Sequence, residues 1–203
     1  MAYYKVDEAS LTAVADAIRE RAGTTEPMQF PDGFVGAVNG IPSGVPENDV
    51  IGLIEKTGLH FDIPYGCTKI GNSLFRASSI KTVTIPDTVT LIDSMAFFQS
   101  GLNGLVELPS NLQTIAGTAF QQCYGLVITR MPASVQKIEG SAFYACTAIT
   151  SLTFDGTPTS IAADAFSKCN NLAVINVPWE EGAVADAPWG APIATINYNY
   201  SGG

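Results

Sequence analysis

The sequence predicts an α/β repeat protein: a solenoid with one short strand on each rung, preceded by a small helical module. Three aligned columns support this prediction. A phenylalanine recurs at positions 75, 97, 120, 143 and 166, an isoleucine stands five places before each one, and a proline opens most units. Three columns that keep one register from position 64 to position 166 are not a coincidence. A period of roughly 22–23 residues is typical of a solenoid.

Each column has a structural interpretation. The isoleucine and phenylalanine side chains are expected to point into the coil, and the alanine before each phenylalanine is expected to allow a tight turn. Each unit closes on a short strand of alternating apolar residues, such as Leu152 and Phe154. One unit cannot bury both of its faces, so stacking must make the core continuous. The predicted core residues are Ile70, Phe75, Ile92, Phe97, Ile115, Phe120, Ile138, Phe143, Ile161, Phe166, Val184 and Trp189.

The chain before the repeat is expected to divide into two parts. Residues 1–41 predict a small helical module, because apolar residues at 11, 14, 15 and 18 form an amphipathic stripe. Residues 42–58 predict a linker and an N-terminal cap, since their first part is rich in glycine and proline and lacks apolar periodicity.

Residues 59–177 predict the solenoid proper, with about five units. Residues 178–203 predict a degenerate sixth repeat, because Val184 and Trp189 fall one repeat period after Ile161 and Phe166, the last members of the two columns. Solenoid ends need atypical repeats that cover the core. Four aromatic residues fit such a cap, and an aromatic sugar-binding cluster is the alternative. They are Trp179, Trp189, Tyr198 and Tyr200.

Charge and hydropathy disfavour two classes of partner. The net charge is −9, and residues 61–178 carry seven acids and six bases. Without a basic stripe, nucleic-acid binding is not expected. No apolar run reaches the roughly 18–20 residues of a membrane span. The opening MAYYKVDEAS has acids where a signal peptide has its apolar stretch, so no such signal is expected.

Cysteine and histidine give no support for a metal or cofactor site. Cys123, Cys146 and Cys169 are spaced by one repeat period and predict small buried side chains in one column. A disulfide ladder is not expected, because neighbouring rungs point their side chains in parallel. Cys67 aligns instead with core positions of later units. His60, the single histidine, aligns with Thr82 at an outward strand position, so a zinc site lacks ligands.

Catalytic motifs are also missing from the sequence. It contains no phosphate-binding loop that ends in Lys-Ser/Thr, no His-Glu-x-x-His and no Gly-x-Ser-x-Gly. A carboxylate pair for glycoside hydrolysis cannot be recognised from spacing alone. We therefore do not expect an enzyme, and a glycan-degrading enzyme is the least favoured class.

The outward strand positions and the turns beside them are the candidate binding surface. Phe98 and Tyr144 directly follow the repeat phenylalanine, where covering neighbouring rungs is favoured over contact with a ligand. The strand candidates lie beside the inward residues of successive units. They are Thr84, Glu107, Arg130, Thr153 and Asn176.

The unit IP-x-x-V-x-x-I-x-x-x-A-F-x-x-C-x-x-L-x-x-L-x-I resembles the BspA-like (Treponema pallidum type) leucine-rich repeat. MPASVQKIEGSAFYACTAITSLTF at 131–154 is close to its consensus. The resemblance covers about 63–178 and implies a right-handed, curved solenoid with a strand on each rung. It also implies a surface or adhesive protein that binds host proteins or partner cells.

Both ends of the chain resemble tail-associated proteins from phages and prophages of gut Firmicutes. The stretches are LTAVADAIRERAGTTEPMQFPDGFVGAVNGI at 11–41 and VPWEEGAVADAPWGAPIATINYNY at 177–200. This resemblance implies a virion protein assembled in the cytoplasm, with residues 1–41 attached to other tail proteins and the solenoid directed at a protein or cell-surface polymer. A homo-oligomer is an expectation of this class. The alternative is an adhesin-like protein on a bacterial surface.

Overall fold

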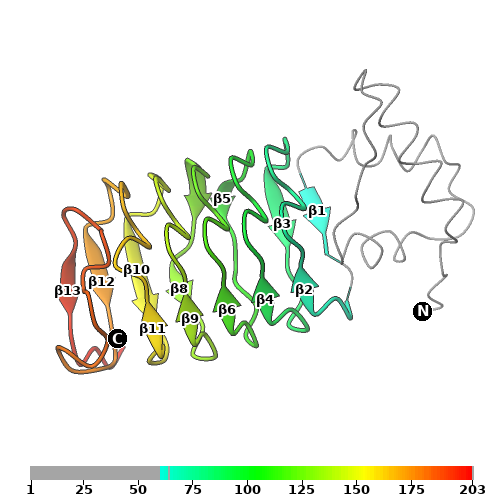
Figure 1. Cartoon of the computed structure of the whole chain (residues 1–203). Coiled ribbons are helices and arrows are strands. Elements are labelled where there is room, and N and C mark those ends of the chain that lie inside the picture. Colours follow the sequence, from blue (N-terminus) through cyan, green and yellow to red (C-terminus); the bar gives the residue numbers. More distant parts are fainter. Residues whose placement is uncertain (1–59, 64, 203) are drawn as a thin grey trace, which may run out of the picture.

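The computed structural model describes residues 60–63 and 65–202, which wind into a parallel β-solenoid of about six turns (Figure 1). Short strands lie in two rows along the coil. The first row is one sheet of five strands, β2 (Lys69–Ile70), β4 (Leu91–Ile92), β6 (Thr114–Ile115), β9 (Lys137–Ile138) and β11 (Ser160–Ile161). The second row forms three sheets, with the strands β1 (His60–Asp62) and β3 (Thr82–Thr84); β5 (Asn103–Leu105) and β7 (Gly125–Val127); and β8 (Arg130–Met131), β10 (Ser151–Phe154), β12 (Val174–Asn176) and β13 (Thr195–Asn197).

The predicted α/β class and the single strand per rung are both wrong for this part of the chain. The described residues contain no helix, so they form an all-β solenoid. In the first four units the residues two before and two after the repeat phenylalanine have positive φ, for example 56° at Ser141 and 58° at Ala145, and in the fifth unit the residue two after it does, with 59° at Lys168. A helix needs negative φ throughout, so turns form here instead. Most rungs carry a second strand, because each core isoleucine and the residue before it pair with the neighbouring rungs.

The helical module predicted for residues 1–41 and the linker and cap predicted for 42–58 lie outside the described residues. Within the described part, no helix has the length and apolar character that crossing a bilayer requires.

The isoleucine column is a ladder at the centre of the first row. Ile70 pairs with Ile92, and the same partner relation continues through every later strand of that sheet. All five isoleucines are at most 4% exposed. Each is followed by a turn and preceded by a more exposed residue, so the two-residue strands already show the inside-outside alternation of a β-strand.

The phenylalanine column is a continuous stack of rings. Neighbouring centroids from Phe75 to Phe166 are 5.1–5.3 Å apart, and the ring planes differ by 1–11°. Successive strands lie about 4.7–4.9 Å apart, so the rings follow the rise of the coil with a small offset. Phe61 closes the N-terminal end of the described stack edge-on, 5.0 Å from Phe75.

The alanine before each repeat phenylalanine does not itself make the turn. The positive φ values fall on the residues that flank the Ala-Phe pair. The alanine instead lies fully inside the coil, with 0% exposure at Ala96, Ala119, Ala142 and Ala165. A small side chain is needed there because the interior is already filled by the ring beside it, and larger groups in a close-packed core cause strain.

The cysteine column is a line of buried, free thiols that hydrogen-bond between rungs. Each Sγ donates to the carbonyl oxygen of a phenylalanine one rung earlier. The Sγ–O distances are 2.9 Å for Cys123, 3.0 Å for Cys146 and 3.0 Å for Cys169. Burial raises the pKa of Cys123 and of Cys169 to about 11. The thiols are therefore protonated at neutral pH and act as small core side chains.

We expect the three column thiols to resist alkylation while the protein is folded. At pH 8 a pKa of about 11 lowers the thiolate fraction of Cys123 and Cys169 roughly 100-fold relative to an ordinary cysteine. Burial raises the pKa of Cys146 as well and slows attack on all three. Iodoacetamide should modify Cys67, which is half-buried, well before the other three. Mass spectrometry of peptides from native and urea-unfolded protein checks this. Equal labelling of Cys67 and Cys146 in the folded protein would contradict it.

The C-terminal end of the solenoid is an aromatic cluster under a last strand. β13 pairs with β12, with Ile196 opposite Ile175. Trp189 is fully buried, and its indole packs 6.3 Å from Trp179 and 6.1 Å from Phe154. Its backbone carbonyl accepts the N–H of Phe166 at 2.9 Å, a position that alanine takes in the earlier rungs. In this shortened unit Trp189 thus takes the backbone position of the alanine in the earlier units, one residue before the phenylalanine position, and its large ring still fills the interior.

Candidate binding surface

Three of the strand candidates form one continuous row on the sheet β8-β10-β12-β13. Arg130 lies directly opposite Thr153, and Thr153 lies opposite Asn176. Asn197, which the sequence interpretation missed, continues the row on β13. Parallel pairing holds these side chains at the strand spacing of about 4.7–4.9 Å, so four rungs present their polar groups side by side.

Hydrogen bonds order the C-terminal half of this row. The Asn197 side-chain amide donates to Asn176 Oδ1 at 2.8 Å, and the Asn176 amide donates to Thr153 Oγ1 at 3.1 Å. Arg130 Nε donates to Asp155 Oδ2 at 3.2 Å, and a second guanidinium nitrogen contacts the other carboxylate oxygen. Arg130 is exposed, so this ion pair fixes its side chain more than it stabilises the fold.

Thr84 and Glu107 do not join this row through any strand pairing in the described residues. Thr84 pairs with Asp62 at the N-terminal end of the described solenoid. Glu107 is exposed and follows the end of β5, where the second row changes from one sheet to another. The predicted outward column is therefore divided into separate parts.

Phe98 and Tyr144 lie on a different part of the rung, on the turn after the core phenylalanine. Both are half-buried. Arg76 lies 5.4 Å from the centre of the Phe98 ring, and Lys168 lies 5.1 Å from that of Tyr144. In each pair the cation comes from an adjacent rung, so each aromatic ring covers its neighbour and holds a cation over its face.

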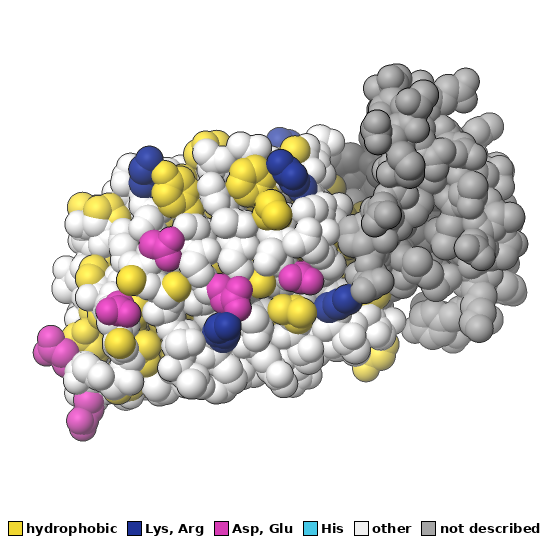
Figure 2. Space-filling model, viewed as in Figure 1, with side chains coloured by type: hydrophobic (Ala, Val, Ile, Leu, Met, Phe, Trp, Pro, Cys, Tyr) yellow, Lys and Arg dark blue, Asp and Glu magenta, His cyan; other side chains and the backbone are white. Residues whose placement is uncertain are grey.

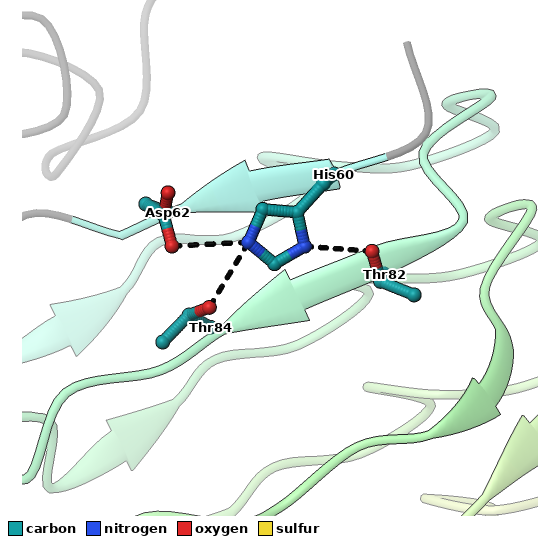
Figure 3. A network of polar contacts seen from close by, with 4 residues as sticks. All are labelled: His60, Asp62, Thr82 and Thr84. Carbon is teal, nitrogen blue, oxygen red and sulfur yellow. Dashed lines mark hydrogen bonds and ion pairs between the residues drawn. The ribbon is translucent and has the colours of Figure 1, made fainter. Parts of the chain in front are cut away.

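A polar network surrounds His60 on β1 and β3 (Figure 3). His60 lies opposite Thr82, as the repeat alignment predicts. Its Nδ1 is 2.7 Å from Thr82 Oγ1, and its Nε2 is 3.0 Å from Asp62 Oδ1 and 3.1 Å from Thr84 Oγ1. The hydrogen bonds from Thr84 and then from His60 lower the pKa of Asp62. The histidine side chain is 47% exposed. The network thus has the character of cross-strand polar pairs on a solvated sheet face.

Charged groups are sparse on the solenoid. Figure 2 shows them spread over the face drawn, some beside a group of opposite charge, between larger areas of uncharged surface. Among the described residues, no group of three or more histidine, cysteine, aspartate or glutamate side chains is arranged to hold a metal ion.

The sequence interpretation also missed a polar column between each unit's proline and its isoleucine. Thr68, Thr90, Gln113 and Gln136 recur there and line a shallow groove. The signal was present in the sequence, since each of these units carries a hydroxyl or amide at this position.

Comparisons with known proteins follow from this repeat. A family model described as the BspA type leucine rich repeat region matches residues 68–182 in 6 copies. A crystal structure of a leucine-rich repeat protein from Bacteroides ovatus ATCC 8483 is similar at 24% identity and a TM-score of 0.45, and the match covers 59% of this chain but 32% of that one. No curated protein matches the chain. Because the family model matches more than half of its residues, the chain belongs to the BspA-type leucine-rich repeat family.

Proposed function

We propose that this chain is a non-enzymatic interaction protein of a phage or prophage tail, whose solenoid recognises a target on a bacterial cell surface. Leucine-rich repeats of this family are typically interaction scaffolds. The tail setting is supported by the resemblance of residues 11–41 and 177–200 to tail-associated proteins. In this proposal residues 1–41 attach the chain to the particle, and the particle is assembled in the cytoplasm.

The observation that carries the recognition role is the row Arg130, Thr153, Asn176 and Asn197. Four successive strands present hydrogen-bonding groups in one line. The cross-rung hydrogen bonds already order the side chains of the row. This lowers the entropic cost of fixing these side chains when a target binds. A rigid line of polar groups of this kind suits a cell-surface target whose own hydrogen-bonding groups are regularly spaced and point in one direction.

Asn176→Ala is expected to weaken binding of the full chain to target cells about threefold to tenfold. The change removes the hydrogen-bonding side chain at the middle of the row. The fold should lose no more than about 3 kcal/mol, because two cross-rung hydrogen bonds are lost, one to Thr153 and one from Asn197. Flow cytometry of bacterial cells with fluorescently labelled protein measures the binding, and urea unfolding measures the stability.

Asn170→Ala is the matched control, because Asn170 is an exposed asparagine outside the row. It should bind as the unchanged protein does. Equal loss for both variants, or none for either, would contradict recognition through the row. Immunogold labelling of induced phage particles tests the tail setting separately. Label on the surface of intact bacteria, and none on particles, would instead identify an adhesin-like protein.

A further inference from the structure

A shallow, open groove of about 640 Å³ runs across four successive rungs beside the first row of strands. Its volume lies within the range of ligand pockets in proteins. The lining consists of Gly66, Thr68, Asp87, Thr88, Thr90, Asn111, Gln113, Ser134 and Gln136. All of these are polar or glycine. The groove lies apart from the strand row Arg130, Thr153, Asn176 and Asn197, because none of those residues contributes to it.

The hydroxyl groups of the groove are held as hydrogen-bond acceptors. Thr88 Oγ1 donates to the Cys67 carbonyl at 2.8 Å, and Ser134 Oγ donates to the Leu112 carbonyl at 2.7 Å. Thr90 makes the same bond to the preceding rung at 3.2 Å. Since each hydroxyl has one hydrogen to donate, the lone pairs of Thr90 and Ser134 are left for a ligand. Thr88 Oγ1 already accepts the Gly66 backbone N–H at 3.1 Å, so it has less accepting capacity left. The groove therefore suits a ligand that brings many donors.

Amide groups add further polar contacts along the same line. The Asn111 side-chain nitrogen donates to the Asp87 carbonyl at 2.9 Å, which leaves Asn111 Oδ1 as an acceptor. The Gln113 side chain is exposed, and no hydrogen bond to another described residue occupies its amide. Gln113 can therefore both donate to and accept from a ligand at the centre of the groove.

Asp87 is the single charged residue in the lining. Its Oδ1 accepts hydrogen bonds from the Ser110 backbone N–H at 2.7 Å and the Ser110 hydroxyl at 2.8 Å. These bonds lower the pKa of Asp87, so it is ionised at neutral pH. A single carboxylate among neutral acceptors repels a phosphate or another polyanion, so an anionic ligand is disfavoured. No aromatic or large aliphatic residue is among the lining residues, which differs from the anchors that dominate protein–protein interfaces.

We propose that this groove binds an extended, uncharged polysaccharide, whose hydroxyl groups donate to the ladder of Thr, Ser, Asn and Asp oxygens. The rungs repeat about every 4.7–4.9 Å, a spacing comparable with one sugar ring along an extended chain. This inference rests on the proposed recognition of a bacterial cell surface. It adds the chemical class of the target and the place on the solenoid where it binds.

The test uses the full chain and four soluble neutral oligosaccharides: cellohexaose, chitohexaose, mannohexaose and maltohexaose. Titration calorimetry is expected to detect binding of at least one of them. Gln113→Ala should weaken that binding roughly tenfold, since both donor and acceptor are lost at the centre. Asp87→Asn keeps an acceptor oxygen for Ser110 and removes the charge, so a neutral sugar should lose less than about threefold. Asn176→Ala, in the strand row, should have no effect on oligosaccharide binding.

Each result separates this inference from the proposed function. Absence of binding to all four oligosaccharides, or binding that Gln113→Ala leaves unchanged, overturns the groove proposal. If cell binding is then still lost in Asn176→Ala, the proposed function stands without it. A loss in Asp87→Asn larger than that in Gln113→Ala would show that the charge of Asp87, and not the neutral groups at the centre, dominates binding, and would also overturn the proposal.

Discussion

Replacing Phe143 with alanine is expected to lower the free energy of unfolding by about 3–5 kcal/mol. Phe143 is 0% exposed and lies between two parallel rings, 5.3 Å from Phe120 and 5.2 Å from Phe166. Truncation therefore removes apolar burial and two ring contacts and leaves a cavity that the neighbours cannot fill, because the backbone hydrogen bonds of adjacent rungs fix their positions. Urea unfolding followed by circular dichroism measures the change.

Phe98→Ala is the control for this prediction. Phe98 directly follows a core phenylalanine but is half-buried and covers an arginine. Its removal should cost no more than about 1.5 kcal/mol, because the ring leaves solvent-accessible space instead of a closed cavity. Equal destabilisation by the two variants would show that the ring stack is not the main stabilising column. A loss below about 1 kcal/mol for Phe143→Ala would contradict the interior position itself.

The core of this fold could be predicted from the sequence because the buried positions recur periodically. Ile115 and Phe120 recur at fixed intervals, and every rung places them against their counterparts in the rungs before and after. An in-register solenoid makes identical residues neighbours, so a one-dimensional repeat translates directly into contacts. The same logic placed His60 opposite Thr82.

The turns were harder to predict because their conformation is set by the stack and not by local propensity. Met95 and Gln122 have φ of 55° and 61°, which side chains other than glycine and asparagine rarely adopt. No local signal announces such values. They persist because each turn hydrogen-bonds to the next rung, as when Met95 N–H donates to the Gly117 carbonyl.

The candidate surface was only partly predictable for a related reason. Outward residues do not have to pack in the core. Their position in the repeat therefore does not determine which of them are paired on neighbouring strands. Glu107 lies outside any strand, so no strand pairing joins it to Arg130, although the two occupy the same place in the repeat. Asn197 joined the row because the sixth unit is shortened, and its register is known from pairing with β12.

Trp189→Ala is expected to destabilise the C-terminal end by about 3–5 kcal/mol and to release β13 from β12. The indole is fully buried, its N–H donates to the Ala185 carbonyl at 2.7 Å, and it fills the interior beyond Phe166. In a solenoid each rung is stabilised mainly by its neighbours, so loss of the end rung exposes the next one. Hydrogen exchange should speed up at Thr195–Asn197 and then at Val174–Asn176, whereas Lys137–Ile138 stays protected.

Ile193→Ala is the control within the same cap, because Ile193 is 58% exposed and its truncation should change exchange little. Uniformly faster exchange across the solenoid would indicate one cooperative unit and contradict a local role for the cap.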